Sequence, residues 1–147
     1  MVRSMQYRSG MNPKALELQE RTRRFATAVI KFCEGLPRDT ATQKIVEQLL
    51  DSAGSTDSNY RATCRARSRN EFISKVGVAA EEADESKGWL QLLVQAGKTS
   101  HETAGALIRE ADELTAIFVS SRITAQTNKA VREQLQRQMK KPRRRRT

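Results

Sequence analysis

Residues 55–90, STDSNYRATCRARSRNEFISKVGVAAEEADESKGWL, contain one sharp break in an otherwise helical sequence. Ser68 and Glu71 have the spacing of a capping box, in which a hydroxyl and a carboxylate bond free backbone N–H groups at a helix start. The break therefore falls at Ser68. It is surrounded by four arginines, which are Arg61, Arg65, Arg67 and Arg69.

Apolar and small residues recur at steps of four and three along the whole chain. The rows run from Leu18 to Leu36, from Ile45 to Asn59, from Phe72 to Leu93 and from Leu107 to Ala125. Such steps are the pattern of an amphipathic helix. Because the period is close to 3.5, the rows predict helices that pack side by side at shallow angles.

Residues that satisfy free backbone groups mark the ends of these helices. Asn12 followed by Pro13 predicts the first helix start, since Asn is a good N-cap and proline suits the first helical position. Gly35 and Pro37 end that helix. Capping-box spacings place two later starts, at Thr40 with Gln43 and at Thr99 with Glu102.

Together these signals predict an all-α protein. The expected helices cover residues 13–34, 41–65, 69–96 and 100–127. Their short connections force neighbouring helices to run antiparallel, which gives an up-down-up-down four-helix bundle. We expect a flexible N-terminal arm over 1–12, the bundle over 13–127, and a basic disordered tail over 128–147, where like charge outweighs apolar surface.

The chain is strongly basic. It has 27 Lys and Arg against 17 Asp and Glu, a formal net charge of +10 and a pI near 10.2, which favours a polyanionic partner. Residues 137–147 carry seven of these ten charges. In the predicted bundle the turn at Ser68 shares one end with the start of the first helix and the end of the last. That end gathers Arg3, Arg8, Lys14, the four turn arginines, Lys129, Arg132 and the tail.

Phosphate contact is the chemistry that this basic end indicates, because guanidinium groups offer forked donors and stay charged. If the helix continued through the turn, Arg61, Arg65 and Arg69 would align, while Arg67 would project elsewhere. The further candidate nucleic-acid-binding residues are Lys129, Arg132, Arg137, Lys140, Lys141, Arg143, Arg144, Arg145 and Arg146. The alternatives are a solvated turn with a solubilising tail or, in a eukaryotic host, a nuclear-localisation signal.

Other residue types favour no reaction and no cofactor. The two cysteines, Cys33 and Cys64, are expected to be free, buried or half-buried thiols, and His101 a surface residue. No metal motif is present, since the Glu-x-x-His pattern of carboxylate bundles is missing. Glu81, Glu82, Asp84 and Glu85 are expected to pair with basic residues of another helix or subunit. Without a signal peptide or an apolar run of about 20 residues, we expect a soluble, cytoplasmic protein.

The second helix has small residues over its later half. Ser52, Ala53, Gly54, Ser55, Thr56 and Ser58 leave almost no large apolar surface there. Two explanations remain open, which are close packing against the third helix and contact with another subunit.

An ordered series of residues resembles the bacterial four-helix-bundle family of large-subunit rRNA intervening-sequence proteins. The series consists of Asn59-Tyr60-Arg61, Ser68, Glu71-Phe72-Ile73-x-Lys75, Glu82-Ala83-x-Glu85 and Trp89-Leu90. The resemblance covers about residues 15–126. It implies a four-helix bundle, commonly a ring-like homopentamer with a basic surface. This family includes the accessory variability determinant of diversity-generating retroelements. For that branch, the resemblance also implies binding to a reverse transcriptase and its template RNA. The basic tail beyond Asn128 is not part of the family core.

We therefore expect a non-enzymatic, homo-oligomeric nucleic-acid-binding accessory protein that binds structured RNA and assists a partner enzyme such as a reverse transcriptase. The alternative is a protein-interaction scaffold that docks a partner enzyme and touches nucleic acid only incidentally.

Overall fold

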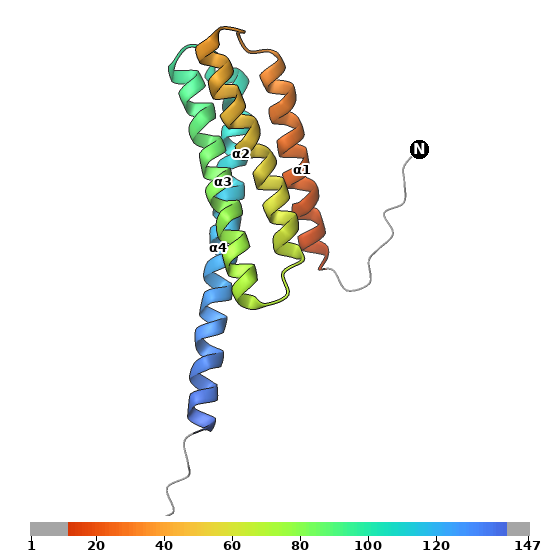
Figure 1. The fold of residues 1–147 in the computed structure, drawn as a ribbon, viewed down its shortest axis with the longest axis vertical. Helices are drawn as coiled ribbons and strands as arrows, with labels where there is room; N and C mark the ends of the chain where they lie inside the picture. The colour runs from red at the N-terminus through yellow and green to blue at the C-terminus, as the bar shows by residue number, and fades with distance from the viewer. Residues whose placement is uncertain (1–11, 141–147) are drawn as a thin grey trace, which may run out of the picture.

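The structure is a computed structural model that describes residues 12–140. Within this range the chain folds into α1 (Pro13–Glu34), α2 (Thr40–Cys64), α3 (Arg69–Gln95) and α4 (His101–Met139). The helices run up, down, up and down beside one another, as Figure 1 shows. The predicted antiparallel four-helix bundle is confirmed. The N-terminal arm expected over residues 1–12 lies outside the described residues, apart from Asn12.

The helix starts follow the predicted caps, with two shifts of one residue. The side chain of Asn12 accepts from Lys14 N–H and that of Ser68 from Glu71 N–H, as expected. The second helix is capped by Asp39 rather than Thr40, and the fourth by Ser100 rather than Thr99. Asp and Ser rank at least as high as Thr among N-cap residues, which accounts for the two shifts.

The predicted end of α4 is wrong. The helix was expected to end at residue 127 but continues to Met139. Residues 128–139, here called the α4 extension, contain Ala, Leu, Gln, Arg, Lys and Glu, which are good helix formers, and neither glycine nor proline. Lys129 and Glu133 add an ion pair one turn apart, 4.0 Å between Nζ and Oε1. Residues 141–147 of the predicted disordered tail lie outside the described residues.

The core is aliphatic, with one aromatic pair. Its fully buried large side chains include Val29, Leu49, Val76, Leu90, Leu93, Leu114 and Phe118. The rings of Tyr60 and Phe118 stack with centroids 5.2 Å apart, which ties α2 to α4. Within residues 12–140, no helix has an apolar stretch long enough to cross a lipid bilayer.

The small residues of α2 pack mainly inside the bundle. Ser52, Ala53 and Thr56 are buried, and the hydroxyl of Ser86 on α3 donates to that of Ser52 over 2.8 Å. This hydrogen bond requires the two helices to approach closely, which larger side chains would prevent. Gly54 and Ser58 are exposed on the other side of α2. Close packing against α3 therefore accounts for the buried half of the row.

Ion pairs attach α4 to both of its neighbours, α1 and α3. Arg21 of α1 binds the carboxylate of Glu110 on α4 through two nitrogens, at 2.6 and 3.1 Å, and also contacts Glu113. The hydrogen bond from Arg21 to Glu110 raises the pKa of the guanidinium group. Lys87 of α3 reaches Asp112 of α4 at 2.7 Å. These bonds hold α4 in place on both sides.

Candidate nucleic-acid interface

One end of the bundle collects cationic side chains from all four helices. The start of α1, the α2–α3 turn and the α4 extension lie at this end (Figure 1). We call it the basic pole and define it by Lys14, Arg61, Arg65, Arg67, Arg69, Lys129 and Arg132. Arg3 and Arg8, also expected here, lie outside the described residues. The topology thus brings together residues that are far apart in the sequence.

The α2–α3 turn holds its backbone with local hydrogen bonds. Arg65 caps α2, and its N–H donates to carbonyls of the last turn of that helix. Glu71 N–H donates to Ser68 Oγ at 3.1 Å, and Arg67 N–H donates to the Glu71 carboxylate at 3.3 Å. The turn therefore needs no arginine side chain for its own structure.

Three of the turn arginines are free to bind a partner. Arg65, Arg67 and Arg69 are all exposed. None of them forms an ion pair with a carboxylate in residues 12–140, since the nearby Glu71 pairs with Lys75. Because α2 ends at Cys64, Arg61, Arg65 and Arg69 do not form the continuous helical row considered from the sequence. Arg65, Arg67 and Arg69 instead spread around a short, fixed turn.

Arg61 has a different environment from the other three. Its Nε lies 3.4 Å from the carboxylate of Asp57, which is buried, and Arg23 of α1 reaches the same oxygen at 3.0 Å. The hydroxyl of Thr22 also donates to Asp57, at 3.2 Å. Arg61 therefore neutralises a buried charge between α1 and α2. It adds to the positive field of the basic pole, but it is not a free phosphate ligand.

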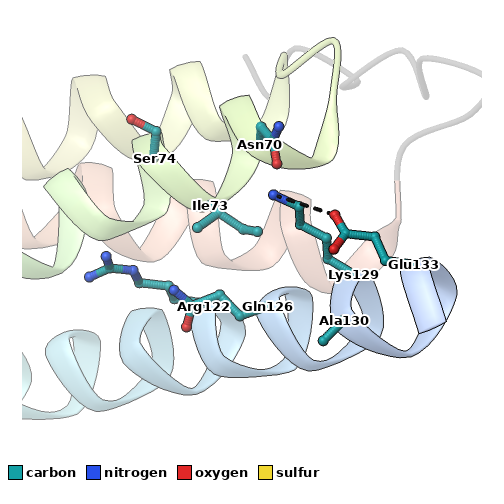
Figure 2. Close-up of a pocket in the computed structure, with 8 residues that line it drawn as sticks. All are labelled: Asn70, Ile73, Ser74, Arg122, Gln126, Lys129, Ala130 and Glu133. Atoms are coloured by element: carbon teal, nitrogen blue, oxygen red, sulfur yellow. Dashed lines mark ion pairs between the residues drawn. The ribbon is translucent and has the colours of Figure 1, made fainter. Parts of the chain in front are cut away.

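A groove runs between the first half of α3 and α4. Its volume is about 590 Å³, and its lining residues are Asn70, Ile73, Ser74, Arg122, Gln126, Lys129, Ala130 and Glu133 (Figure 2). Lys129 spans toward α3 and pairs with Glu133, while Arg122 extends along the groove away from the turn. The groove thus places Lys129 beside Arg69 of the turn and Arg122 further along α3.

Arg122 was not among the predicted site residues. Its guanidinium group lies against Gly77 of α3, where an added Cβ would come within 3.3 Å of Arg122 Cζ. A glycine inside a predicted helix can indicate close approach by a neighbour. However, the sequence does not indicate which side chain approaches Gly77, so only the structure identifies Arg122.

A second hollow opens at the same end. It has a volume of about 830 Å³ and residues of all four helices line it, including the apolar Leu18, Phe72 and Ile117 and the cationic Lys14 and Arg69. Tyr60 also lines it, and burial raises the pKa of this phenol. The basic pole therefore combines cationic side chains with concave surface.

The other predicted binding residues fall into two groups. Arg132, Arg137 and Lys140 are exposed on the α4 extension and its C-cap, and not in a disordered segment as expected. Lys141, Arg143, Arg144, Arg145 and Arg146 lie outside the described residues. Because this segment is helical, the spacing of Arg132, Arg137 and Lys140 along it is fixed. The segment extends away from the bundle (Figure 1).

The remaining titratable residues form no metal site in the described part of the chain. Cys33 and Cys64 are half-buried free thiols, and burial raises the pKa of Cys33 to about 11. His101 is exposed at the start of α4, as predicted. Cys33 and His101 lie toward the other end of the bundle, whereas Cys64 lines the second hollow of the basic pole.

The carboxylates of α3 do not behave as expected within one copy. Glu81, Glu82, Asp84 and Glu85 form no ion pair with another helix of the described chain, where the α3 lysine Lys87 pairs with Asp112. Burial raises the pKa of Glu82, and the charges of Glu85, Glu81 and Asp51 raise it further. Lys87 of the same helix attracts Asp84, but no cation of another described helix pairs with these four carboxylates, so their pairing with another subunit stays a prediction.

These features define a class of protein, an antiparallel four-helix bundle with a basic pole. The comparisons identify the family within that class. The model of the 23S rRNA-intervening sequence protein family matches residues 14–120, and the chain belongs to this family. The family resemblance inferred from the sequence is confirmed, while membership of its retroelement branch stays a prediction.

A solved structure supports the same assignment. It is a protein of unknown function from the S23 ribosomal protein family of Bacteroides thetaiotaomicron VPI-5482, with a TM-score of 0.64 and 26% sequence identity. The match covers 71% of this chain and 97% of that one. No curated protein gives a significant match. The α4 extension begins after the end of the family match.

Proposed function

We propose that this protein is a non-enzymatic, homo-oligomeric RNA-binding accessory protein of the cytoplasm. In this proposal the basic pole holds the backbone of a structured RNA and presents it to a partner enzyme, such as a retroelement reverse transcriptase. The observation that carries the proposal is the exposure of Arg65, Arg67 and Arg69 on a turn that does not need their side chains.

Electrostatics favour a polyanion at this end. Arginines without acidic partners retain their full positive field, and Lys129 and Arg132 extend that field along α4. A nucleic acid that binds here releases counterions from its phosphates, which is the main source of affinity in such complexes. Binding at the pole is therefore expected to depend strongly on salt.

RNA is favoured over DNA by two considerations. The family name associates its members with intervening sequences of 23S rRNA. In addition, the arginines surround a compact turn beside a groove and a hollow, and no helix within residues 12–140 presents a row of base-reading side chains as major-groove readers do. This arrangement suits recognition of folded RNA through its shape and backbone.

The pole suits binding and not catalysis. Guanidinium groups stay protonated at neutral pH, so they hold phosphate well but cannot accept a proton. General acid–base chemistry needs a group with a pKa near the working pH. We therefore assign no reaction to this site.

A second candidate function is a protein-interaction scaffold that docks a partner enzyme. The exposed apolar side chains of Val131, Leu135 and Met139 on the α4 extension favour it. A partner protein that stays bound through nuclease treatment supports this candidate. A partner that is lost after nuclease treatment supports the RNA-binding function.

The test of the proposal compares a structured RNA with a DNA duplex of the same length by fluorescence anisotropy across a salt series. We expect RNA to bind more tightly than DNA near physiological salt, and Arg65→Ala with Arg67→Ala and Arg69→Ala to remove most of that difference. Equal affinities for both polymers that collapse together with salt would contradict the proposal, because they would show nonspecific counterion release alone.

A further inference from the structure

The α4 extension has an apolar row that nothing in the described chain covers. Val131, Leu135 and Met139 are 51%, 54% and 84% exposed. They are spaced four residues apart, so they lie on the same side of the helix. The extension continues past the start of α1 and the α2–α3 turn (Figure 1), and the exposed fractions show that no other described helix covers the row. Such an exposed row indicates an interaction surface.

The charges of the extension restrict its partner. Lys129, Arg132, Arg137 and Lys140 accompany the apolar row, with Glu133 as the only acid among residues 128–140. Arg132 lies three residues before Leu135 and therefore borders the row. Pairing two extensions would bring like charges together. A partner surface complementary to the extension is instead acidic and has apolar side chains at its centre.

The outer face of α3 has these properties. We define the acidic face by Glu81, Asp84, Glu85, Trp89 and Leu92. Leu92 is 41% exposed, and a shallow hollow of about 470 Å³ lies over Gly88, between Asp84 and Leu92. An added Cβ at Gly88 would meet nothing within 4 Å, so the space is open. In the described chain no cation of another helix neutralises these carboxylates.

The two surfaces also match in length but cannot meet within one copy. The apolar row spans about 12 Å and the acidic face about 17 Å, at about 1.5 Å per helical residue. Residues 81–92 lie in the part of α3 remote from the α2–α3 turn, while the extension leaves the bundle beyond that turn (Figure 1). A continuous α4 therefore cannot fold back onto its own acidic face.

We propose that the α4 extension of one copy docks on the acidic face of α3 in a second copy. Val131, Leu135 and Met139 cover Trp89 and Leu92, and the flanking cations pair with the carboxylates. The contact specifies the oligomeric part of the proposed function and does not require RNA. Two copies that exchange extensions form a closed dimer, while copies that give and receive in turn form a ring or an open chain.

Zero-length carbodiimide cross-linking of the full chain, with half of the protein labelled with ¹⁵N, tests the contact directly. We expect mixed-isotope peptides that join Lys129 or Lys140 to Glu81, Asp84 or Glu85. Cross-links confined to one isotope would place the contact within a single copy. That result, or the absence of these links from an assembled sample, would overturn the proposal.

Sedimentation velocity tests the energetics with matched variants. We expect V131S/L135S/M139S to weaken self-association at least tenfold, while Q126S/A130S on the opposite side of the same helix leaves it within twofold. Circular dichroism confirms equal helicity. Charge reversal by Arg132→Glu or Glu85→Arg should also weaken assembly, and the double variant should restore it. Unchanged assembly of the apolar variant, or no rescue by the double variant, would overturn the contact.

RNA affinity measured on the same samples separates the two proposals. A wild-type chain that binds RNA but stays monomeric at every concentration overturns this contact and leaves the RNA-binding function standing. A chain that assembles through these faces without binding RNA supports this contact and overturns the RNA-binding function. If the apolar variant loses RNA affinity while its self-association is unchanged, the extension is a nucleic-acid surface, and the docking proposal is wrong.

Discussion

At the scale of single residues, Asp57 is the one charged residue that is buried within residues 12–140. Its carboxylate is shared by Arg23, Arg61 and Thr22. Two arginines for one carboxylate leave a surplus positive charge beside the basic pole. The same cluster therefore joins α1 to α2 and adds to the field that attracts a polyanion.

Removing both arginines should leave a buried charge without a partner. Arg23→Ala with Arg61→Ala is expected to lower the free energy of unfolding by about 3 kcal/mol, as for other broken buried pairs. Asp57→Asn should cost less, because both guanidinium groups can reach water. Urea unfolding measures both, with the exposed Arg24→Ala as a control. A double variant as stable as that control would contradict the role assigned to Asp57.

Asp39 gives a prediction about pH. The Thr42 hydroxyl and then its N–H donate to this carboxylate and, with Lys98, lower its pKa from 3.8 to about 2. Because the folded pKa is lowered, the stabilisation is present above about pH 4 and is lost as the pH falls through 2. Asp39→Asn retains a capping side chain but cannot titrate. The melting temperature of the wild type should therefore fall toward that of the Asn variant between pH 4 and pH 2. A difference that stays constant over this range would contradict the assignment.

At the scale of elements, α2 has one tightly packed side and one open side. Ser52→Leu should lower the free energy of unfolding by about 1–3 kcal/mol, because a larger side chain cannot fit against Ser86. Gly54→Ala should raise it by about 0.5–1 kcal/mol, since an added Cβ meets nothing within 4 Å and alanine favours helix. Thermal and urea unfolding of both variants measure this. Equal effects would show that α2 is not packed in this asymmetric way.

The α4 extension should be the least protected helical segment. It buries no core residue, so its helix depends on local propensity and on docking. In dilute protein, the amides of residues 130–139 should exchange hydrogen much faster than those of residues 107–118. Protection of the extension should rise with protein concentration if a second copy covers it. Uniform protection along α4 in dilute protein would contradict this description.

The elements were largely predictable from the sequence. Apolar spacing and caps gave four antiparallel helices, because helix period and N-cap chemistry are local properties. The end of α4 was predicted wrongly at residue 127, since a run of charge can indicate either a disordered tail or an exposed helix. Residues 128–139 are helical because they favour helix locally and contain no glycine or proline.

The candidate site was only partly predictable. Topology alone brought the turn arginines and the end of α4 to one pole. However, the pairing of Arg61 with Asp57 and the contact of Arg122 with Gly77 depend on side-chain directions across helices. Spacing along one helix cannot specify these contacts. Within residues 12–140, the turn arginines without an acidic partner are Arg65, Arg67 and Arg69, and Arg122 lies further along the groove.

At the scale of the whole molecule, charge is distributed unevenly between two surfaces. Exposed cations gather at the basic pole. Carboxylates that have no cationic partner on another described helix lie on the outer face of α3. In the proposed assembly the second surface receives the extension of a neighbour, so several basic poles act on one RNA. Repeated binding sites raise the overall affinity without new kinds of contact.

The central claim is that RNA binds at the basic pole and is not attracted merely by net charge. It is tested most directly by comparing the affinity of R65A/R67A/R69A with that of K31A/R38A/K44A for one structured RNA. The second variant removes the same number of exposed charges from the opposite end of the bundle. We predict that the pole variant lowers the salt slope of binding by about 2 to 3, at about 0.7–0.9 per phosphate contact, while the control stays close to wild type. Equal losses in the two variants would contradict the account.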